Sequence, residues 1–280
     1  MRRLDGRYRL EQRIGIGGMS EVWRAHDAVL DRPVAVKLLS PGQADWAASV
    51  ERIRAEARSA ARLVHPNVAS VHDFGTCAAT PGRELPYIVM ELAEGQTLAA
   101  HLHAGPLDWR IAVRVCAEVS AALAAAHSHG IVHRDVKPAN VMLTPAGVKV
   151  LDFGIATSAG AADTAPEGIV VGTPAYLAPE QLQRAPATPA ADIYALGVLL
   201  YRCLAGRLPY PADNVTQLLG PHGRQPRARC PSCPACPPRW PTCAGAASPR
   251  TRSGDRAAWS PRCCSPRRWT PGCTCRCRSR

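Results

Sequence analysis

The sequence predicts an α+β fold of two lobes, in which a small β-rich lobe with one key helix precedes a larger, mostly helical lobe. Three observations carry this prediction. The first forty residues place β-forming segments around a glycine-rich turn. Residues 98–129 are rich in alanine and leucine at helical spacing. A polar octapeptide at 133–140, followed by Asp152-Phe153-Gly154, breaks that pattern and marks a site rather than a core element.

The N-terminal strands are expected over residues 8–39, around the turn Gly15-Ile16-Gly17-Gly18-Met19-Ser20. Small residues there let backbone N–H groups approach phosphate oxygens closely, although a plain β-hairpin explains the turn equally well. In the following strand, Ala35 and Lys37 share one face, whereas Val34 and Val36 point the other way. If the first face lines a cleft, Lys37 needs an acidic partner.

The helix that can supply this acid is predicted over Ser49–Val64 and ends before Pro66. Its expected inner stripe consists of apolar residues at helical spacing: Val50, Ile53, Ala57, Ala60 and Val64. Glu56 is the expected partner of Lys37, and Glu51 is the rival. Two strands, Val68–Phe74 and Tyr87–Met90, complete the small lobe, with a polar loop between them at Gly75–Pro86.

Two helices, Leu98–His103 and Trp109–His129, open the larger lobe. The second is predicted to be a core helix, with an apolar stripe at Val113, Ala117, Ala121 and Leu123. His127 and His129 are interpreted as surface or capping residues, and Gly130 ends the helix as a C-cap does. Two short strands, Val141–Leu143 and Val148–Leu151, flank the octapeptide and the Asp152 triplet.

The octapeptide His133-Arg134-Asp135-Val136-Lys137-Pro138-Ala139-Asn140 and the Asp152 triplet place two acids, a lysine and an amide near one centre. Phosphoryl transfer needs such a set: an acid for the hydroxyl proton, metal ligands and a cation for the migrating charge. The two segments match the catalytic and metal loops of the protein kinases. From about Arg7 to Leu219, the order and spacing of all motifs resemble the bacterial eukaryotic-like (Hanks-type) Ser/Thr protein kinases, of actinobacterial type.

This resemblance implies a bilobal kinase fold, ATP and Mg²⁺ as ligands, and Ser/Thr hydroxyls of proteins as acceptors. Asp135 is expected to deprotonate the hydroxyl, Lys137 to contact the transferred phosphate, and Asn140 and Asp152 to hold Mg²⁺. Lys37 is expected to hold the α- and β-phosphates and to pair with Glu56. The nucleotide-binding positions that it implies are Ile14, Gly15, Gly17, Val22, Ala35, Lys37, Glu91 and Ala93, the last two through hinge backbone groups behind which Met90 lies. Ser20 departs from the family's third glycine.

Regulatory positions are implied by the same resemblance. Arg134 suggests that a phosphate on the 155–171 loop orders the site. The threonines with an implied regulatory role are Thr157 and Thr164 in that loop and Thr173 after it. Glu180 is expected to form a buried ion pair with a late arginine. Asp192 is expected to hold the backbone of the catalytic loop, with a plain helix N-cap as the alternative.

Composition divides the chain near Leu219. Residues 220–280 hold 13 of the 34 basic residues and only one of the 22 acids, so this tail carries the whole net charge of +12 and the remainder is neutral. The tail also holds nine of the 12 cysteines and contains no Leu, Ile, Val, Phe, Met or Tyr. Such a segment cannot bury a core. We therefore predict a small lobe at 7–92, an incomplete large lobe at 93–219, and a disordered tail.

Three interpretations of the tail remain. Cys230, Cys233 and Cys236 have zinc-like spacing but are interrupted by prolines. A basic arm could bind acidic surfaces without specificity. We favour a shifted reading frame, because reading Ser232–Arg256 one nucleotide earlier, with GC-rich codons, gives a family-like helix and an Asp-Pro-x-x-Arg-Pro turn. An incomplete lobe leaves the alternative of a non-catalytic or misfolded remnant.

The expected location and binding partners follow partly from sequence features that are not found. No apolar run of eighteen or more residues and no signal-peptide segment is evident, which favours a cytoplasmic protein without a membrane segment. The neutral charge of residues 1–219 argues against specific nucleic-acid binding. The resemblance further suggests a homodimer for trans-autophosphorylation.

Overall fold

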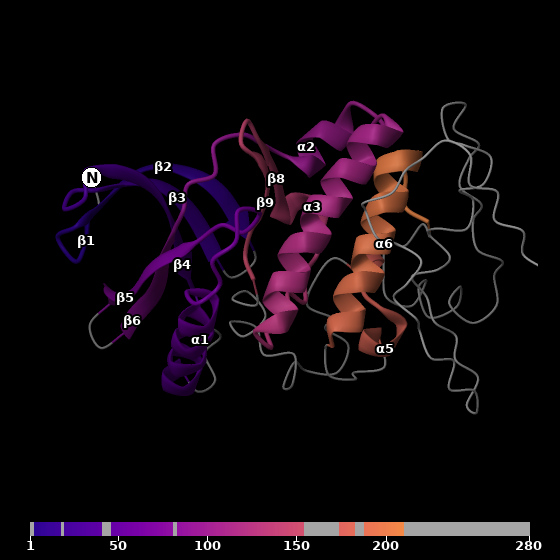
Figure 1. The fold of residues 1–280 in the computed structure, drawn as a ribbon. Coiled ribbons are helices and arrows are strands. Elements are labelled where there is room, and N and C mark those ends of the chain that lie inside the picture. Colours follow the sequence, from indigo (N-terminus) through magenta and orange to yellow (C-terminus); the bar gives the residue numbers. More distant parts are fainter. Residues whose placement is uncertain are drawn as a thin grey trace, which may run out of the picture. The chain divides into compact units, whose positions relative to one another are not determined.

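The computed structural model has a β-rich N-terminal lobe and a largely helical C-terminal lobe, so the predicted fold class is confirmed (Figure 1). It describes residues 3–17, 20–40, 46–80, 83–153, 174–182 and 188–209.

The N-terminal lobe is built on one antiparallel sheet of six strands, in the order β1-β2-β3-β4-β6-β5. Its strands are β1 (Arg3–Leu4), β2 (Tyr8–Gly17), β3 (Ser20–Asp27), β4 (Arg32–Leu39), β5 (Val71–Thr80) and β6 (Arg83–Met90). The ends of β2 and β3 pair at Gly17 and Ser20 and carry the glycine-rich turn. The sheet thus presents this turn and the strand of Lys37 side by side.

The two faces of the sheet bury different residues. Val34 and Val36 belong to one apolar cluster, and Ala35 belongs to another that includes Ile53 and Ala57 of helix α1 (Trp46–Ala60). The alternation predicted for β4 is therefore correct. The helix begins and ends earlier than predicted, so Val64 lies beyond it and is 87% exposed.

The loop predicted between residues 75 and 86 is wrong, because β5 and β6 extend through it as a hairpin. The Thr76 hydroxyl donates to Glu84 across the pair at 2.7 Å. Polar residues such as Thr76 and Glu84 gave this segment the composition of a loop, but its backbone completes the ladder of two paired strands.

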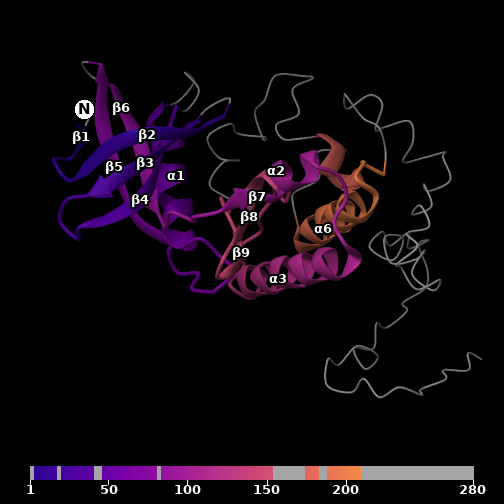
Figure 2. The same cartoon turned by 90° about the horizontal axis from the view of Figure 1, so that it is seen from above.

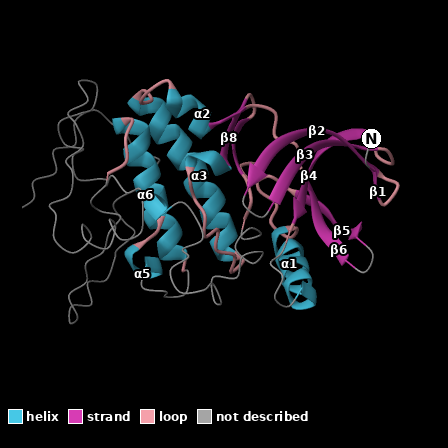
Figure 3. Ribbon diagram, turned by 180° about the vertical axis from the view of Figure 1, so that it is seen from behind, coloured by secondary structure: helices cyan, strands magenta, loops and turns pink. Residues whose placement is uncertain are grey.

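The C-terminal lobe packs its two long helices, α3 (Trp109–Ser128) and α6 (Pro189–Ala205), against each other (Figure 2). Its remaining elements are β7 (Gln96–Thr97), α2 (Leu98–His103), η1 (Pro138–Asn140), β8 (Val141–Thr144), β9 (Gly147–Val150), η2 (Pro174–Tyr176) and α5 (Pro179–Leu182). Strands β7, β8 and β9 form a small sheet beside α2 and α3 (Figure 3).

Helix α3 is a core helix, as predicted, but it buries a different stripe. The buried residues are Ala112, Val115, Cys116, Val119, Ala122, Leu123 and Ala126. Of the predicted stripe only Leu123 is buried, since Ala117 and Ala121 are exposed and Val113 is intermediate. Alanines on every side of the helix make its periodicity ambiguous. Among the described residues, α3 alone is long and apolar enough to span a membrane, but its buried face packs within the lobe.

Candidate active site

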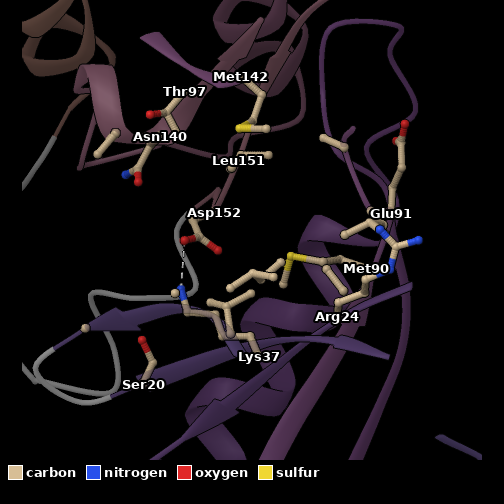
Figure 4. A pocket seen from close by; sticks show the side chains of 18 of the residues that line it. Ser20, Arg24, Lys37, Met90, Glu91, Thr97, Asn140, Met142, Leu151 and Asp152 are labelled. Atoms are coloured by element: carbon tan, nitrogen blue, oxygen red, sulfur yellow. Dashed lines mark ion pairs between the residues drawn. The ribbon is translucent and has the colours of Figure 1, made fainter. Parts of the chain in front are cut away.

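One large cavity of about 1060 Å³ lies where the glycine turn, the hinge and the catalytic loop meet (Figure 4). It is lined by all eight predicted nucleotide-binding residues: Ile14, Gly15, Gly17, Val22, Ala35, Lys37, Glu91 and Ala93. Asp135, Lys137, Asn140 and Asp152 line it as well. Residues from widely separated parts of the sequence therefore share one cavity.

The ammonium group of Lys37 pairs with Asp152 rather than with Glu56. Its Nζ lies 2.9 Å from Asp152 Oδ2, and only 3% of the Lys37 side chain is exposed (Figure 4). Glu56 lies 3.7 Å from Arg134, measured from its Oε1 to Nη1. The predicted Lys37–Glu56 ion pair does not form between these two described residues. Both candidate partners are carboxylates, so position rather than residue type decides which of them pairs with Lys37.

The catalytic loop is held together by polar contacts around Asp135. Lys137 Nζ lies 2.7 Å from Asp135 Oδ2, and the Asn140 amide nitrogen donates to the same oxygen at 3.0 Å. That nitrogen also donates to the Asp135 carbonyl at 2.8 Å. The Asn140 side chain is thereby oriented, and its amide oxygen accepts no hydrogen bond from the described residues.

Beneath the loop, His133 is buried, and this burial lowers the pKa of its imidazole. Its Nδ1 accepts the Asp135 N–H at 3.2 Å, so Nε2 carries the proton and donates to the Leu151 carbonyl at 2.9 Å. The ring packs on Phe153, with centroids 4.6 Å apart. His133 thus ties the segment of Asp135 to the segment of Asp152.

Asp192 on α6 holds the catalytic loop from behind. Its buried carboxylate accepts the backbone N–H groups of His133 and Arg134, at 2.8 and 2.9 Å. It does not act as the N-cap of α6, a position that Thr188 occupies. His127, which sequence reasoning assigned to the surface or to a cap, lies 2.8 Å from Asp192 through Nε2 and is only 16% exposed. Its spacing on a helix gave no sign of this contact.

The residues present fit Mg²⁺ and a nucleotide. Carboxylate and amide oxygens are the donors that Mg²⁺ prefers, and Asp152 and Asn140 supply both kinds at the cavity wall. Lys37 adds a nearly buried cation beside the glycine-rich turn, where phosphates would lie.

Sequence reasoning missed other lining residues. They include Gln12, Ile16, Arg24, Leu39, Leu92, Glu94, Thr97, Ala139, Met142 and Leu151. Several could have been found from strand register. Arg24 lies two positions after Val22 in β3, so the two residues share one face of the sheet, and Met142 likewise occupies one of the two alternating faces of β8. Met90 and Ser20 also line the cavity.

Most of the predicted regulatory residues lie outside the described part of the chain. Thr157, Thr164 and Thr173 lie outside the described residues. Glu180 is half-buried in α5 and forms no ion pair with any described residue. The tail at 220–280 also lies outside the described part of the chain.

The glycine-rich ends of β2 and β3, a lysine–aspartate pair and the catalytic loop surround one cavity, which is the arrangement expected of a protein kinase. The model of the protein kinase domain matches residues 8–235, and the chain belongs to this family. The match extends past Leu219, where sequence reasoning ended the large lobe. The alternative of a non-catalytic or misfolded remnant is therefore not favoured.

Among known proteins, the chain is 44% identical over 225 residues to serine/threonine-protein kinase PknA of Mycobacterium tuberculosis. It is 40% identical over 223 residues to serine/threonine-protein kinase PrkC of Bacillus subtilis. These alignments cover 80% and 79% of this chain but only 52% and 34% of the relatives. The crystal structure of the Mycobacterium tuberculosis PknI kinase domain aligns with a TM-score of 0.57 and 30% identity, over 72% of this chain and 75% of that one.

Proposed function

We propose that this protein transfers the γ-phosphate of ATP to Ser or Thr hydroxyls of proteins, its own 155–171 loop included. The observation that carries the proposal is the convergence of Lys37, Asp135, Asn140 and Asp152 on one cavity that Gly15 and Gly17 also line. Relatives that are named serine/threonine-protein kinases support the choice of acceptor.

The geometry suggests a role for each residue. Asp135 accepts the hydroxyl proton, and its carboxylate is already oriented by Lys137 and Asn140. In this proposal Lys137 would contact the transferred phosphate, and Lys37 would contact the α- and β-phosphates. Mg²⁺ held by Asp152 and Asn140 would neutralise negative charge on the phosphates. Lys37 must then leave Asp152, so we infer that the described arrangement precedes nucleotide binding.

Arg134 provides a route for regulation. It lies 3.7 Å from Glu56 and is 41% exposed, so a phosphate on the 155–171 loop could compete for its guanidinium group. Release of Glu56 would allow the expected pair with Lys37 to form. Thr157 and Thr164 are the proposed modification sites, and Thr173 completes the set of candidate threonines. A homodimer would allow this phosphorylation in trans.

Replacing the metal ligand tests the activity. Asp152→Asn should abolish magnesium-dependent transfer from ATP to a Ser/Thr peptide, because it removes the only anionic ligand in the proposed pair. Arg114→Met is a matched control, since Arg114 is 79% exposed on α3 and does not line the cavity. Retained transfer in Asp152→Asn would overturn the assignment.

We infer a cytoplasmic protein that binds ATP and protein substrates, without specific nucleic-acid binding. Fractionation of cells that express the full chain, followed by immunoblotting, tests the location directly, and recovery in the membrane fraction would contradict it.

A further inference from the structure

Lys149 on β9 makes contacts that the proposed catalytic roles do not use. Its Nζ lies 2.8 Å from Glu91 Oε1 and 3.0 Å from Oε2, so the ammonium group bridges both carboxylate oxygens. The same nitrogen lies 3.5 Å from the Val68 carbonyl. The Lys149 side chain is 18% exposed and that of Glu91 is 31% exposed. The pair is therefore partly shielded from water, unlike an isolated surface pair.

Glu91 is at the same time a residue of the cavity wall. Its backbone N–H donates to the Ser70 carbonyl at 2.8 Å, and its side-chain Oε2 accepts the Ser70 N–H at 3.2 Å. Glu91 is consequently held through its backbone and its side chain on one side. The groups that it presents to the cavity are set by that fixed orientation (Figure 4).

The segment that contacts Glu91 is itself fastened to β9. Val68 pairs with Val150 as a parallel bridge, the Ala69 N–H donates to the Val150 carbonyl at 3.0 Å, and the Val150 N–H donates to the Asn67 carbonyl at 2.8 Å. Three chain segments thus meet at one ammonium group: the hinge after β6, the segment before β5, and β9 of the C-terminal lobe.

We infer that Lys149 is a positioning residue for the nucleotide. It does not line the cavity, but through Glu91 it fixes the hinge backbone against the C-terminal lobe at the edge where an adenine would bind. Preorganised backbone groups bind without the entropic cost of ordering them. Loss of Lys149 therefore weakens nucleotide binding while leaving Asp135 and Asp152 in place. This inference rests on the proposed function only for the identity of the ligand.

The test measures binding and turnover separately in the full chain. In Lys149→Met, we expect the Kd for ADP without magnesium, measured by calorimetry, and the KM for ATP to rise about two- to fivefold, as for a partly shielded ion pair. The kcat should stay within about twofold, because no group that contacts the reacting atoms changes. Lys149→Arg, which keeps the charge, should restore both constants. Arg58→Met, at an exposed position of α1 that does not line the cavity, should match the wild type.

A second variant keeps the inference testable if the Lys149→Met protein does not fold. Glu91→Gln keeps the hinge backbone and removes only the charge, so it should raise the Kd for ADP to a similar extent. The double variant, with Lys149→Met and Glu91→Gln together, should have a Kd for ADP no higher than that of the single variant with the higher Kd. The reason is that the two side chains act as one unit. Unchanged Kd in both single variants, or a change in kcat alone, overturns the inference. Wild-type protein that neither binds ADP nor transfers phosphate would instead count against the proposed function.

Discussion

Two non-glycine residues beside the cavity adopt left-handed backbone conformations, Arg134 with φ of 68° and Asp152 with φ of 59°. Such conformations cost about 1–3 kcal/mol each and persist only where the surroundings enforce them. Here the enforcing groups are identifiable. The Asp192 carboxylate accepts the Arg134 N–H, and Lys37 pairs with Asp152. Asp5 and Asp31 also have positive φ, but Arg134 and Asp152 belong to the proposed site, Asp152 as a metal ligand and Arg134 as the regulatory arginine.

Removing the Asp192 carboxylate should therefore loosen the catalytic loop. Asp192→Ala leaves the buried N–H groups of His133 and Arg134 without their acceptor, which we expect to cost about 2–4 kcal/mol of unfolding free energy. Asp192→Asn keeps one acceptor oxygen and should cost less. Urea denaturation followed by circular dichroism measures both. Equal stability of Asp192→Ala and the wild type would show that the contact is dispensable.

The ion pair between Arg7 and Asp27 in the N-terminal lobe predicts that the stability of the protein is sensitive to acid. Arg7 binds both carboxylate oxygens of the buried Asp27, at 2.8 and 2.7 Å, and holds the pKa of that carboxyl well below its usual range. A lowered folded-state pKa stabilises the protein fully above the unfolded value of about 3.9. That stabilisation is lost as the pH falls from this value toward the folded pKa.

The melting temperature of the wild type should accordingly fall more steeply below about pH 4 than that of Asp27→Asn. The variant should be less stable than the wild type at pH 7, and the difference should shrink in acid. Glu51→Gln, in an exposed pair on α1, should keep the wild-type pH profile. Parallel profiles for Asp27→Asn and the wild type would contradict this account.

Residue types at the site were predictable because phosphoryl transfer restricts them. The nucleotide-binding positions from Ile14 to Ala93 could be assigned from the resemblance to the kinase motifs, whereas other lining residues such as Arg24 and Met142 were missed. Pairing was not predictable to the same degree. Whether Lys37 meets Glu56 or Asp152 depends on where α1 lies, and two alternatives with the same charge differ only in distance. The contact between His127 and Asp192 joins residues 65 positions apart, which no local pattern encodes.

At the scale of elements, the hinge after β6 lies against the small sheet of the C-terminal lobe. Gly95 comes just after the hinge, and a Cβ atom there would collide with the backbone carbonyl of Leu143 in β8. Backbone atoms in a paired strand cannot move aside as a flexible side chain can. The close approach of these two segments thus requires glycine.

Gly95→Ala should lower the unfolding free energy by about 1–3 kcal/mol, as overpacking does, and should raise the KM for ATP because Gly95 lines the cavity. Gly105→Ala provides a contrasting variant, since a Cβ there meets nothing within 4 Å and only the φ of +130° is unfavourable for alanine. It reports the cost of backbone conformation alone. Thermal denaturation of both variants separates the two effects, and a Gly95→Ala protein as stable as the wild type would exclude the collision.

Element type was more predictable than element orientation. The strand of Lys37 was assigned to the correct face because its valines alternate with Ala35 and Lys37. Helix α3 was assigned the wrong face because alanine and valine are spread around its whole circumference. The pairing of β5 with β6 was missed because polar residues on a strand, such as Thr76 and Glu84, resemble those of a loop.

At the scale of the whole molecule, helix α6 has an apolar face that the described residues cover only in part. Leu196, Leu200 and Leu204 are partly buried, although they belong to an apolar helix packed on α3. The tail beyond Leu219 has no leucine, isoleucine or valine to cover them. We propose that residues 220–280 are read from a shifted frame and that the other frame encodes the missing apolar surface.

Restoring one nucleotide near codon 220 should raise expression, melting temperature and kinase activity together, because it supplies apolar side chains for the partly exposed helix face. It should also supply an arginine for Glu180. The comparison is between full chains in the two frames, and sequencing the gene from codon 215 onward checks the premise. A restored protein that is no more stable or active than this one would leave the tail needing a function of its own.

The pair between Lys37 and Asp152 also links two ligands thermodynamically. A divalent cation that binds Asp152 competes with the lysine ammonium for the same carboxylate, so its affinity is reduced while that ammonium remains in place. Phosphates that attract Lys37 remove the competitor. By reciprocity, the cation must strengthen nucleotide binding by the same factor by which the nucleotide strengthens cation binding. The site is therefore expected to load its two ligands cooperatively, with little affinity for the cation alone.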